Sequence, residues 1–275
     1  MTLGLVLLAV ALAWRGSTFY RLDVATRVEH PDYRTLSPSG FVGHGYGIAG
    51  TALMLTNLLY LVRRRFPSLP VGSMRLWLHI HVFTGLAGAQ LVLFHSAFQL
   101  RTPLASGTGL AVALVVLTGV IGRYLVTLTP KADAELIKDA LATLERIVPG
   151  LRRALREALE AHEISEPSQS LFLPVAIARV PGWLREGRER KQLVLGIVAE
   201  RAGGASVAEA DRETFDRTTA ALADEAAREA HAVAARTVLS SWRGLHRFFA
   251  FLLVVSVVVH VGVAWHYGYR WIWSD

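Results

Sequence analysis

The chain has 275 residues, 52% of them hydrophobic, and a mean hydropathy of +0.37. This composition is too apolar for an average soluble globular protein and points to a membrane protein. The formal net charge is +7, but residues 131–240 hold 16 of the 29 Lys and Arg and 18 of the 22 Asp and Glu, and most remaining arginines flank apolar segments. That distribution argues against nucleic acid as a partner. Cysteine is absent, which excludes disulfides, thiolate metal sites and covalently attached c-type haem.

Five apolar segments are expected to be helical. Four of them reach or approach the roughly 20 residues that a helix needs to cross a bilayer, and we predict that they span the membrane: residues 40–62, 76–100, 108–129 and 247–265. The first segment, residues 2–14, is shorter and could be a signal sequence cleaved after Ala13. Its start lacks a positive charge, so we favour an uncleaved anchor.

The expected fold is therefore all-α, an integral membrane bundle of about five transmembrane helices with a helical insert. Residues 1–130 would hold the first four transmembrane helices, residues 131–240 the insert, and residues 241–275 the last transmembrane helix and a short outer tail. Apolar residues at helical spacing and an alanine-rich stretch, with Pro and Gly between them, predict several helices in the insert. Residues 171–184 could lie on the membrane surface, although packing within the insert is the interpretation we favour.

Arginine placement predicts the orientation. The loop after residue 62 carries four arginines and the loop near residue 101 only Arg101, so the positive-inside rule places the former in the cytoplasm. The insert is then cytoplasmic, in a bacterial-type inner (plasma) membrane, and the C-terminus is outside. The loop of residues 15–39 also carries four arginines but would lie outside, which conflicts with the same rule.

Two membrane segments carry histidines at the same interval. His81 and His95 are 14 residues apart, and so are His246 and His260. In an α-helix, positions 14 apart return to within about 40° of one another and lie about 21 Å apart along the axis. Because the two segments run in the same direction, we expect His81 to face His246 near the cytoplasm and His95 to face His260 near the exterior.

Two opposed imidazoles can supply both axial ligands of an iron porphyrin, so we predict four iron ligands and two non-covalent b-type haems. Gly85 and Gly88 lie on the face of His81 and would let a macrocycle approach the backbone. Arginines near the membrane edges would bind the haem propionates: Arg243, Arg247 and Arg75 near the inner pair, and Arg101 near the outer pair. The alternative is that the histidines and glycines only pack the helices.

Other residues are assigned simpler roles. GYGIAG at residues 45–50 satisfies G-x-G-x-x-G, but it has no preceding strand and indicates helix packing rather than dinucleotide binding. His44 and His266 could serve an outer quinone or acceptor site, with interfacial hydrogen bonding as the default. Three histidines in polar regions are expected to face solvent: His30, His162 and His231.

The two His-x13-His pairs resemble the dihaem transmembrane core of the ferric reductase and NADPH oxidase superfamily. The resemblance covers residues 40–129 and 241–268 and implies transmembrane electron transfer, with the four histidines as axial ligands. The chain reaches Asp275 without the flavin and nicotinamide domain that such reductases often carry, so a separate electron-donor subunit is expected on the cytoplasmic side. The protein would be the electron-transfer subunit of an oxidoreductase. Two alternatives are a haem-free scaffold that recruits partners through its insert and a transporter that relays protons through histidines.

Overall fold

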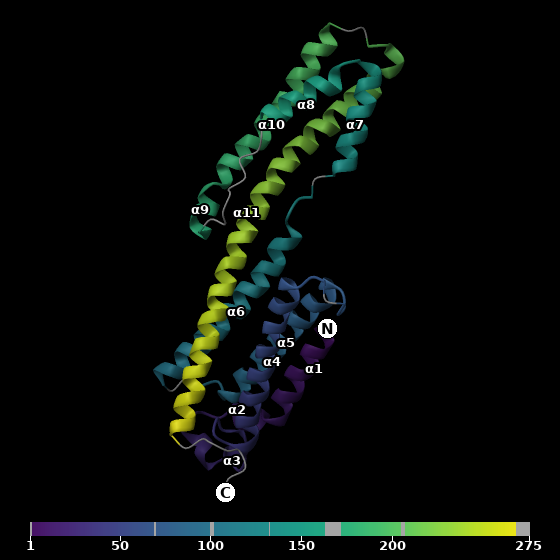
Figure 1. Ribbon diagram of the computed structural model, residues 1–275. Helices are drawn as coiled ribbons and strands as arrows, with labels where there is room; N and C mark the ends of the chain where they lie inside the picture. Colours follow the sequence, from purple (N-terminus) through teal and green to yellow (C-terminus); the bar gives the residue numbers. More distant parts are fainter. Residues whose placement is uncertain are drawn as a thin grey trace. The chain divides into compact units, whose positions relative to one another are not determined.

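A computed structural model describes residues 2–68, 70–99, 102–131, 133–162, 172–204 and 207–267 (Figure 1). Every element among these residues is a helix, which confirms the predicted all-α class. The helices are α1 (Thr2–Arg15), α2 (Ser17–Tyr20), η1 (Thr26–Glu29), α3 (Tyr33–Leu36), α4 (Phe41–Arg65), α5 (Met74–His95), α6 (Pro103–Thr127), α7 (Ala134–Ile147), α8 (Leu151–Ala161), α9 (Leu173–Ala178), α10 (Val180–Gly203) and α11 (Glu209–His266).

Four helical segments are long and apolar enough to cross a membrane: Tyr33–Arg65, Met74–His95, Pro103–Thr127 and Glu209–His266. Each overlaps one of the four segments predicted to span the bilayer, although the second and third predicted segments were placed too far along the chain: α5 ends at His95 rather than residue 100, and α6 ends at Thr127 rather than residue 129. The fifth, α1, is apolar but has only 14 residues, so its role as a span stays a prediction.

The chain divides into two compact units. The first consists of Met1–Val120 and Phe248–Asp275, and the second of Ile121–Arg247. The second unit includes the predicted insert and also takes in the end of α6. The predicted boundary at residues 240 and 241 falls inside α11, which is one uninterrupted helix of 58 residues.

In the first unit, α4 and α5 lie side by side, with α1 against α5 (Figure 1). Helix α5 begins after Ser73, whose side chain accepts a hydrogen bond from the Leu76 amide, as N-cap residues do. It ends at His95. Ala97 and Phe98 then take positive φ angles of 48° and 60°, the left-handed conformation that commonly terminates a helix.

Helices α2, η1 and α3 form a cap, residues 17–37, that packs on this terminus. Phe19, Leu36 and Ala97 make its core. Arg27 is only 6% exposed and donates to the carbonyl oxygens of Leu22, Ala97 and Tyr20 at 2.6 to 3.0 Å. These bonds satisfy the buried guanidinium and tie the cap to the end of α5.

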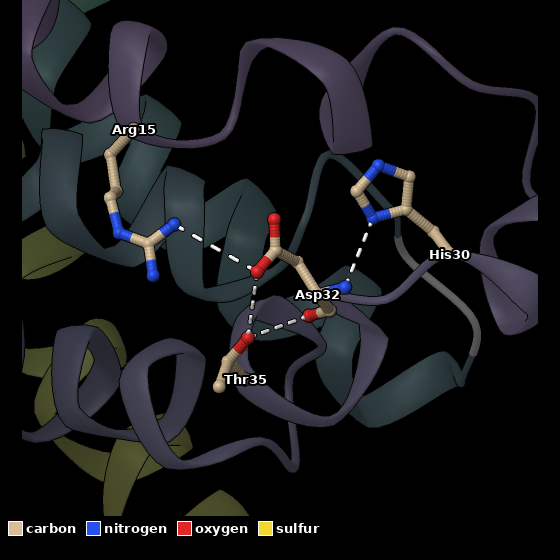
Figure 2. A network of polar contacts seen from close by, with 4 residues as sticks. All are labelled: Arg15, His30, Asp32 and Thr35. Atoms are coloured by element: carbon tan, nitrogen blue, oxygen red, sulfur yellow. Dashed lines mark hydrogen bonds and ion pairs between the residues drawn. The ribbon is translucent and has the colours of Figure 1, made fainter.

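Polar contacts also join the cap to α1. Figure 2 shows Asp32 between Arg15, at 3.9 Å, and Thr35, whose hydroxyl donates to the Asp32 carbonyl oxygen at 2.9 Å. The Asp32 amide donates to Nδ1 of His30 at 3.1 Å. Two of the four arginines in the loop of residues 15–39, Arg15 and Arg27, thus have polar partners in the first unit, and the orientation of this loop stays a prediction.

The cap also buries an aromatic side chain against α5. Tyr20 packs edge-on against Phe94 and Phe98, with ring centroids 5.2 and 5.5 Å away. Burial raises the pKa of Tyr20 to about 12, with a smaller contribution from Tyr46. The phenol is therefore neutral at physiological pH, and it can act as a hydrogen-bond donor but not as an anion.

A buried arginine also organises the other end of α4. Arg63 is 8% exposed, and its guanidinium donates to the carbonyl oxygens of Phe66, Pro67, Val71 and Gly72 at 3.1 to 3.4 Å. Arg63 is one of the four arginines from which the membrane orientation is predicted, and in the structure it also holds the turn between α4 and α5 together.

In the second unit, α7, α8, α10 and α11 lie beside one another (Figure 1) and share a core of mostly aliphatic side chains. Its fully buried members include Leu144, Leu151, Leu155, Val194 and Leu222. The helical spacing of apolar residues predicted in the insert is confirmed for α7, which places Ala140 and Leu144 in the core. Glu225, which is 0% exposed, accepts from the Asp133 amide at 2.6 Å and pairs with Arg228 at 2.9 Å.

The turn between α7 and α8 supplies a pH-dependent contact. The Glu145 carboxylate accepts hydrogen bonds from the Gly150 and Arg152 amides at 2.9 and 2.8 Å. These two bonds lower the pKa of Glu145 below its ordinary value. The resulting stabilisation is complete above the unfolded-state pKa and is lost as pH falls through the folded-state pKa.

We therefore expect Glu145→Gln to loosen this turn near neutral pH and to have no further effect in acid. Hydrogen exchange of the peptide covering residues 148–153, compared at matched pH, checks this. The variant should exchange faster than the natural protein near neutral pH, and the two rates should converge below the folded-state pKa. Equal rates at neutral pH would contradict the role of the carboxylate.

Candidate functional site

The predicted ligand histidines lie on two continuous helices. His81 and His95 are both in α5, and His246 and His260 are both in α11. Neither helix is interrupted between its two histidines. The helical register assumed for both 14-residue intervals is thereby confirmed.

The outer pair lies within one unit. His95 and His260 both belong to the first unit. Their helices meet in an apolar cluster in which Leu253 and Val257 of α11 lie with Val92 of α5. Helices α4 and α6 contribute Met54, Ala111 and Val112 to the same cluster. The two outer histidines thus lie on helices that share this cluster, and their pairing stays a prediction. His44 of α4 lies beside His95.

Helix α4 holds the ring of His95. The Nδ1 atom of His95 lies 2.9 Å from the carbonyl oxygen of Gly43. Because a carbonyl oxygen can only accept, this contact selects the tautomer with the proton on Nδ1 and leaves the Nε2 lone pair available. Metal-binding histidines commonly make this second hydrogen bond, which orients the ring.

A glycine makes room for the same ring. A methyl group at Gly47 would lie 2.8 Å from Nδ1 of His95, which is closer than a carbon atom can approach without displacing the ring. The His44 ring lies beside it, with centroids 6.2 Å apart and planes at 65°. Gly43, His44 and Gly47 together form a cradle around His95, which the sequence analysis did not identify.

Gly85 and Gly88 face α4 in this structure. A methyl group at Gly88 would lie 2.7 Å from the carbonyl oxygen of Gly50, and one at Gly50 would lie 2.8 Å from the carbonyl oxygen of Gly88. A methyl group at Gly85 would lie 3.1 Å from Nδ2 of Asn57. These contacts support the alternative that both glycines allow α4 and α5 to pack closely. Contact between a haem macrocycle and these glycines stays a prediction.

The inner pair is divided between the units. His81, in the first unit, packs against Tyr60 of α4 with ring centroids 5.0 Å apart. One turn further along α5, the Thr84 hydroxyl donates to Asn57 Oδ1 at 2.8 Å. His246 belongs to the second unit, and its pairing with His81 stays a prediction.

The predicted propionate-binding arginines are placed as follows. Arg243 and Arg247 are exposed on α11 in the second unit, where Nε of Arg247 donates to the Arg243 carbonyl oxygen at 3.3 Å. Arg75 is exposed in the first turn of α5. Arg101 lies outside the described residues.

Two histidines expected to face solvent are instead partly buried. His30 packs edge-on against Phe19, with centroids 5.7 Å apart. His231 lies against Gly187, where a methyl group would be 2.5 Å from Nε2 of the imidazole. The expectation was wrong for both, because tertiary packing covers positions whose neighbours in sequence are polar. His162 is exposed, as expected.

No group of three or more His, Asp or Glu side chains within the described ranges is arranged to hold a metal ion. A haem needs only two protein ligands, so the candidate site consists of histidine pairs rather than a cluster. Comparisons with known proteins find no match to a family model, a curated protein or a solved structure.

The contact between Gly50 and Gly88 predicts a strong difference between two glycines of α4. Gly50→Ala should force the backbones of α4 and α5 apart and destabilise the protein by about 1–3 kcal/mol. Gly45→Ala is the matched control, because nothing lies within 4 Å of a methyl group at Gly45. Thermal unfolding of both variants in the same detergent tests this. Equal stabilities would show that α4 and α5 are not in backbone contact.

Proposed function

We propose that the chain is an integral membrane b-type cytochrome that binds two haems and passes single electrons across the bilayer. The observation that carries the proposal is the pair of equal intervals, His81 to His95 and His246 to His260, on two continuous helices. His95 and His260 lie in one unit, on helices that share an apolar cluster, which supports the outer site. His95 has the tautomer that leaves Nε2 free to bind iron.

Four histidines would hold the two haems: His95 with His260 on the outer side, and His81 with His246 on the inner side. When bound, an iron porphyrin with two imidazole ligands exchanges single electrons at a potential set by its ligands and surroundings. Because the two histidines of each helix are about 21 Å apart along its axis, the two haems would lie at different depths in the bilayer. An electron would then cross the membrane in two shorter transfers.

The protein's own residues contribute orientation and a dry environment. The Gly43 carbonyl oxygen holds the His95 ring in one orientation, while Gly47 leaves room for it. The apolar cluster that includes Leu253, Val257 and Val92 lies between the outer and inner histidines along the two helices, and it would keep water out of this stretch. A low dielectric there disfavours charge and so influences the potential of any bound redox group.

Partners and membrane orientation belong to the same proposal. The insert would lie in the cytoplasm of an inner (plasma) membrane and bind a separate electron-donor subunit, and the outer haem would pass electrons to an acceptor or a quinone. The His-x13-His pairs resemble those of the ferric reductase and NADPH oxidase superfamily, and this resemblance supports transmembrane electron transfer.

A visible spectrum of the purified protein tests haem binding. We expect a reduced b-type α-band and two haems per chain. A folded preparation without haem, purified from cells supplied with a haem precursor, would contradict the proposal. A haem-free scaffold or a histidine proton relay would then be the better explanation.

Substitution of one ligand tests the pairing. His260→Ala should remove one haem of two and leave the inner one, because the inner ligands are distant along both helices. His95→Ala should remove the same haem, as judged by its spectrum and midpoint potential. His162→Ala is the control, since this exposed histidine lies in the insert. Loss of different haems in the His95 and His260 variants would disprove the pairing.

The cradle around His95 gives a separate prediction. Gly47→Ala should displace the His95 ring and convert the outer haem toward a high-spin state, which electron paramagnetic resonance detects. Gly45→Ala should leave both haems low-spin, because its methyl group meets no neighbour. An unchanged spectrum in the Gly47 variant would mean that His95 is not held as described.

A further inference from the structure

Helix α9, the residue before it and the start of α10 expose four large apolar side chains. Phe172, Val175, Ile177 and Leu184 are 74%, 44%, 54% and 46% exposed. All four lie outside the predicted transmembrane segments, so lipid around the bundle does not explain their exposure. We call these four residues the α9 face.

Other residues of the same segment are anchored in the second unit. Ala176 is 0% exposed and Trp183 is 5% exposed. The segment therefore combines side chains packed in the insert with apolar side chains that are exposed among the described residues. Packing within the insert accounts for the buried side chains, and contact with the membrane surface accounts for the exposed ones.

The contacts between α10 and α11 determine where the α9 face lies along α11. Gly187 of α10 contacts His231, and four residues later Lys191 pairs with Asp224 at 2.6 Å. The two helices are thus antiparallel. The start of α10, and α9 before it, are directed toward higher residue numbers of α11.

A short extrapolation along the helices places the face near the membrane edge. Val180 is about 10 Å along α10 from Gly187, so it is level with a point about seven residues beyond His231 on α11. Trp242, Arg243 and Arg247 follow within the next three turns, directly before the predicted transmembrane segment. Tryptophan and arginine at such positions are typical of the lipid headgroup region.

The charges beside the α9 face fit an anionic surface. Arg179, Arg185 and Arg188 are exposed near it, while Arg185 also pairs with Glu189 at 3.6 Å. Apolar side chains flanked by arginines are the pattern of segments that lie in the interface of anionic bilayers.

We propose that the α9 face inserts into the headgroup region of the leaflet on the insert's side, with Arg179 and Arg188 against anionic lipid phosphates. The contact fixes the insert at the membrane surface. The proposal is independent of haem binding and requires only that the apolar part of α11 crosses the membrane.

The absence of cysteine from the chain allows a spin label to report on single positions. Full-length Ile177→Cys and Phe172→Cys proteins, labelled and placed in nanodiscs of phosphatidylglycerol and phosphatidylcholine, give collision rates with oxygen and with a water-soluble nickel chelate. Val258→Cys, 65% exposed on the apolar part of α11, is the lipid-exposed reference. Glu209→Cys, whose side chain is 91% exposed at the start of α11, is the water-exposed reference.

The labels at residues 172 and 177 should show an oxygen-to-nickel ratio severalfold higher than the label at residue 209 and lower than the label at residue 258, which lies deeper in the predicted transmembrane segment. A ratio equal to that at residue 209 would overturn the proposal. Low collision rates with both reagents would also overturn it, because they indicate coverage by protein.

Charge reversal tests the lipid phosphates. Arg179→Glu combined with Arg188→Glu should lower the oxygen-to-nickel ratio at residue 177 in phosphatidylglycerol nanodiscs. Arg153→Glu, at a position 85% exposed on α8, is the matched control and should leave the ratio unchanged. A ratio insensitive to the double reversal would disprove the contact between arginine and phosphate.

Discussion

The backbone contact between Gly50 of α4 and Gly88 of α5 sets the arrangement of the candidate site. Helices that meet at glycine can approach until backbone atoms touch, and every side chain on the shared face is then placed relative to that contact. His95 lies toward one end of this face, against Gly43 and Gly47, and Tyr60 packs on His81 toward the other end. Helix α4 therefore orients the histidines of α5, although no residue of α4 was predicted to be an iron ligand.

Much of the fold could be predicted from the sequence because it depends on length and periodicity. The four long apolar helices and the amphipathic α7 follow from patterns that are local in the chain. The continuity of α11 was missed for a physical reason. Its composition changes from alanine-rich and charged to apolar near residue 247, and a change of composition resembles a domain boundary even when no residue ends the helix. Gly244 is the one glycine near that change, and a single glycine costs a helix only about 1 kcal/mol.

The candidate site could be predicted only in part. The 14-residue intervals identify faces of α5 and α11, because helical geometry converts sequence distance into angle. The cradle of Gly43, His44 and Gly47 could not be found in this way, since it depends on which helix packs against α5. The GYGIAG stretch did indicate close packing, and the structure identifies its partner as α5. Three glycines of α4, Gly43, Gly47 and Gly50, recur at intervals of four and three residues and were thus the available signal, but this spacing does not identify the residue that the glycines accommodate.

Arg27 and Arg63 illustrate a further difference between charge in a sequence and charge in a structure. Both are buried, and both donate to peptide carbonyl oxygens. Each guanidinium thereby joins several peptide groups that are not neighbours in the hydrogen-bonding pattern of a helix. Lysine could not replace either arginine without losing bonds, because its compact ammonium group lacks the planar fork of five N–H donors. The cap at one end of α5 and the turn at the other therefore each depend on the geometry of one arginine side chain and not only on its charge.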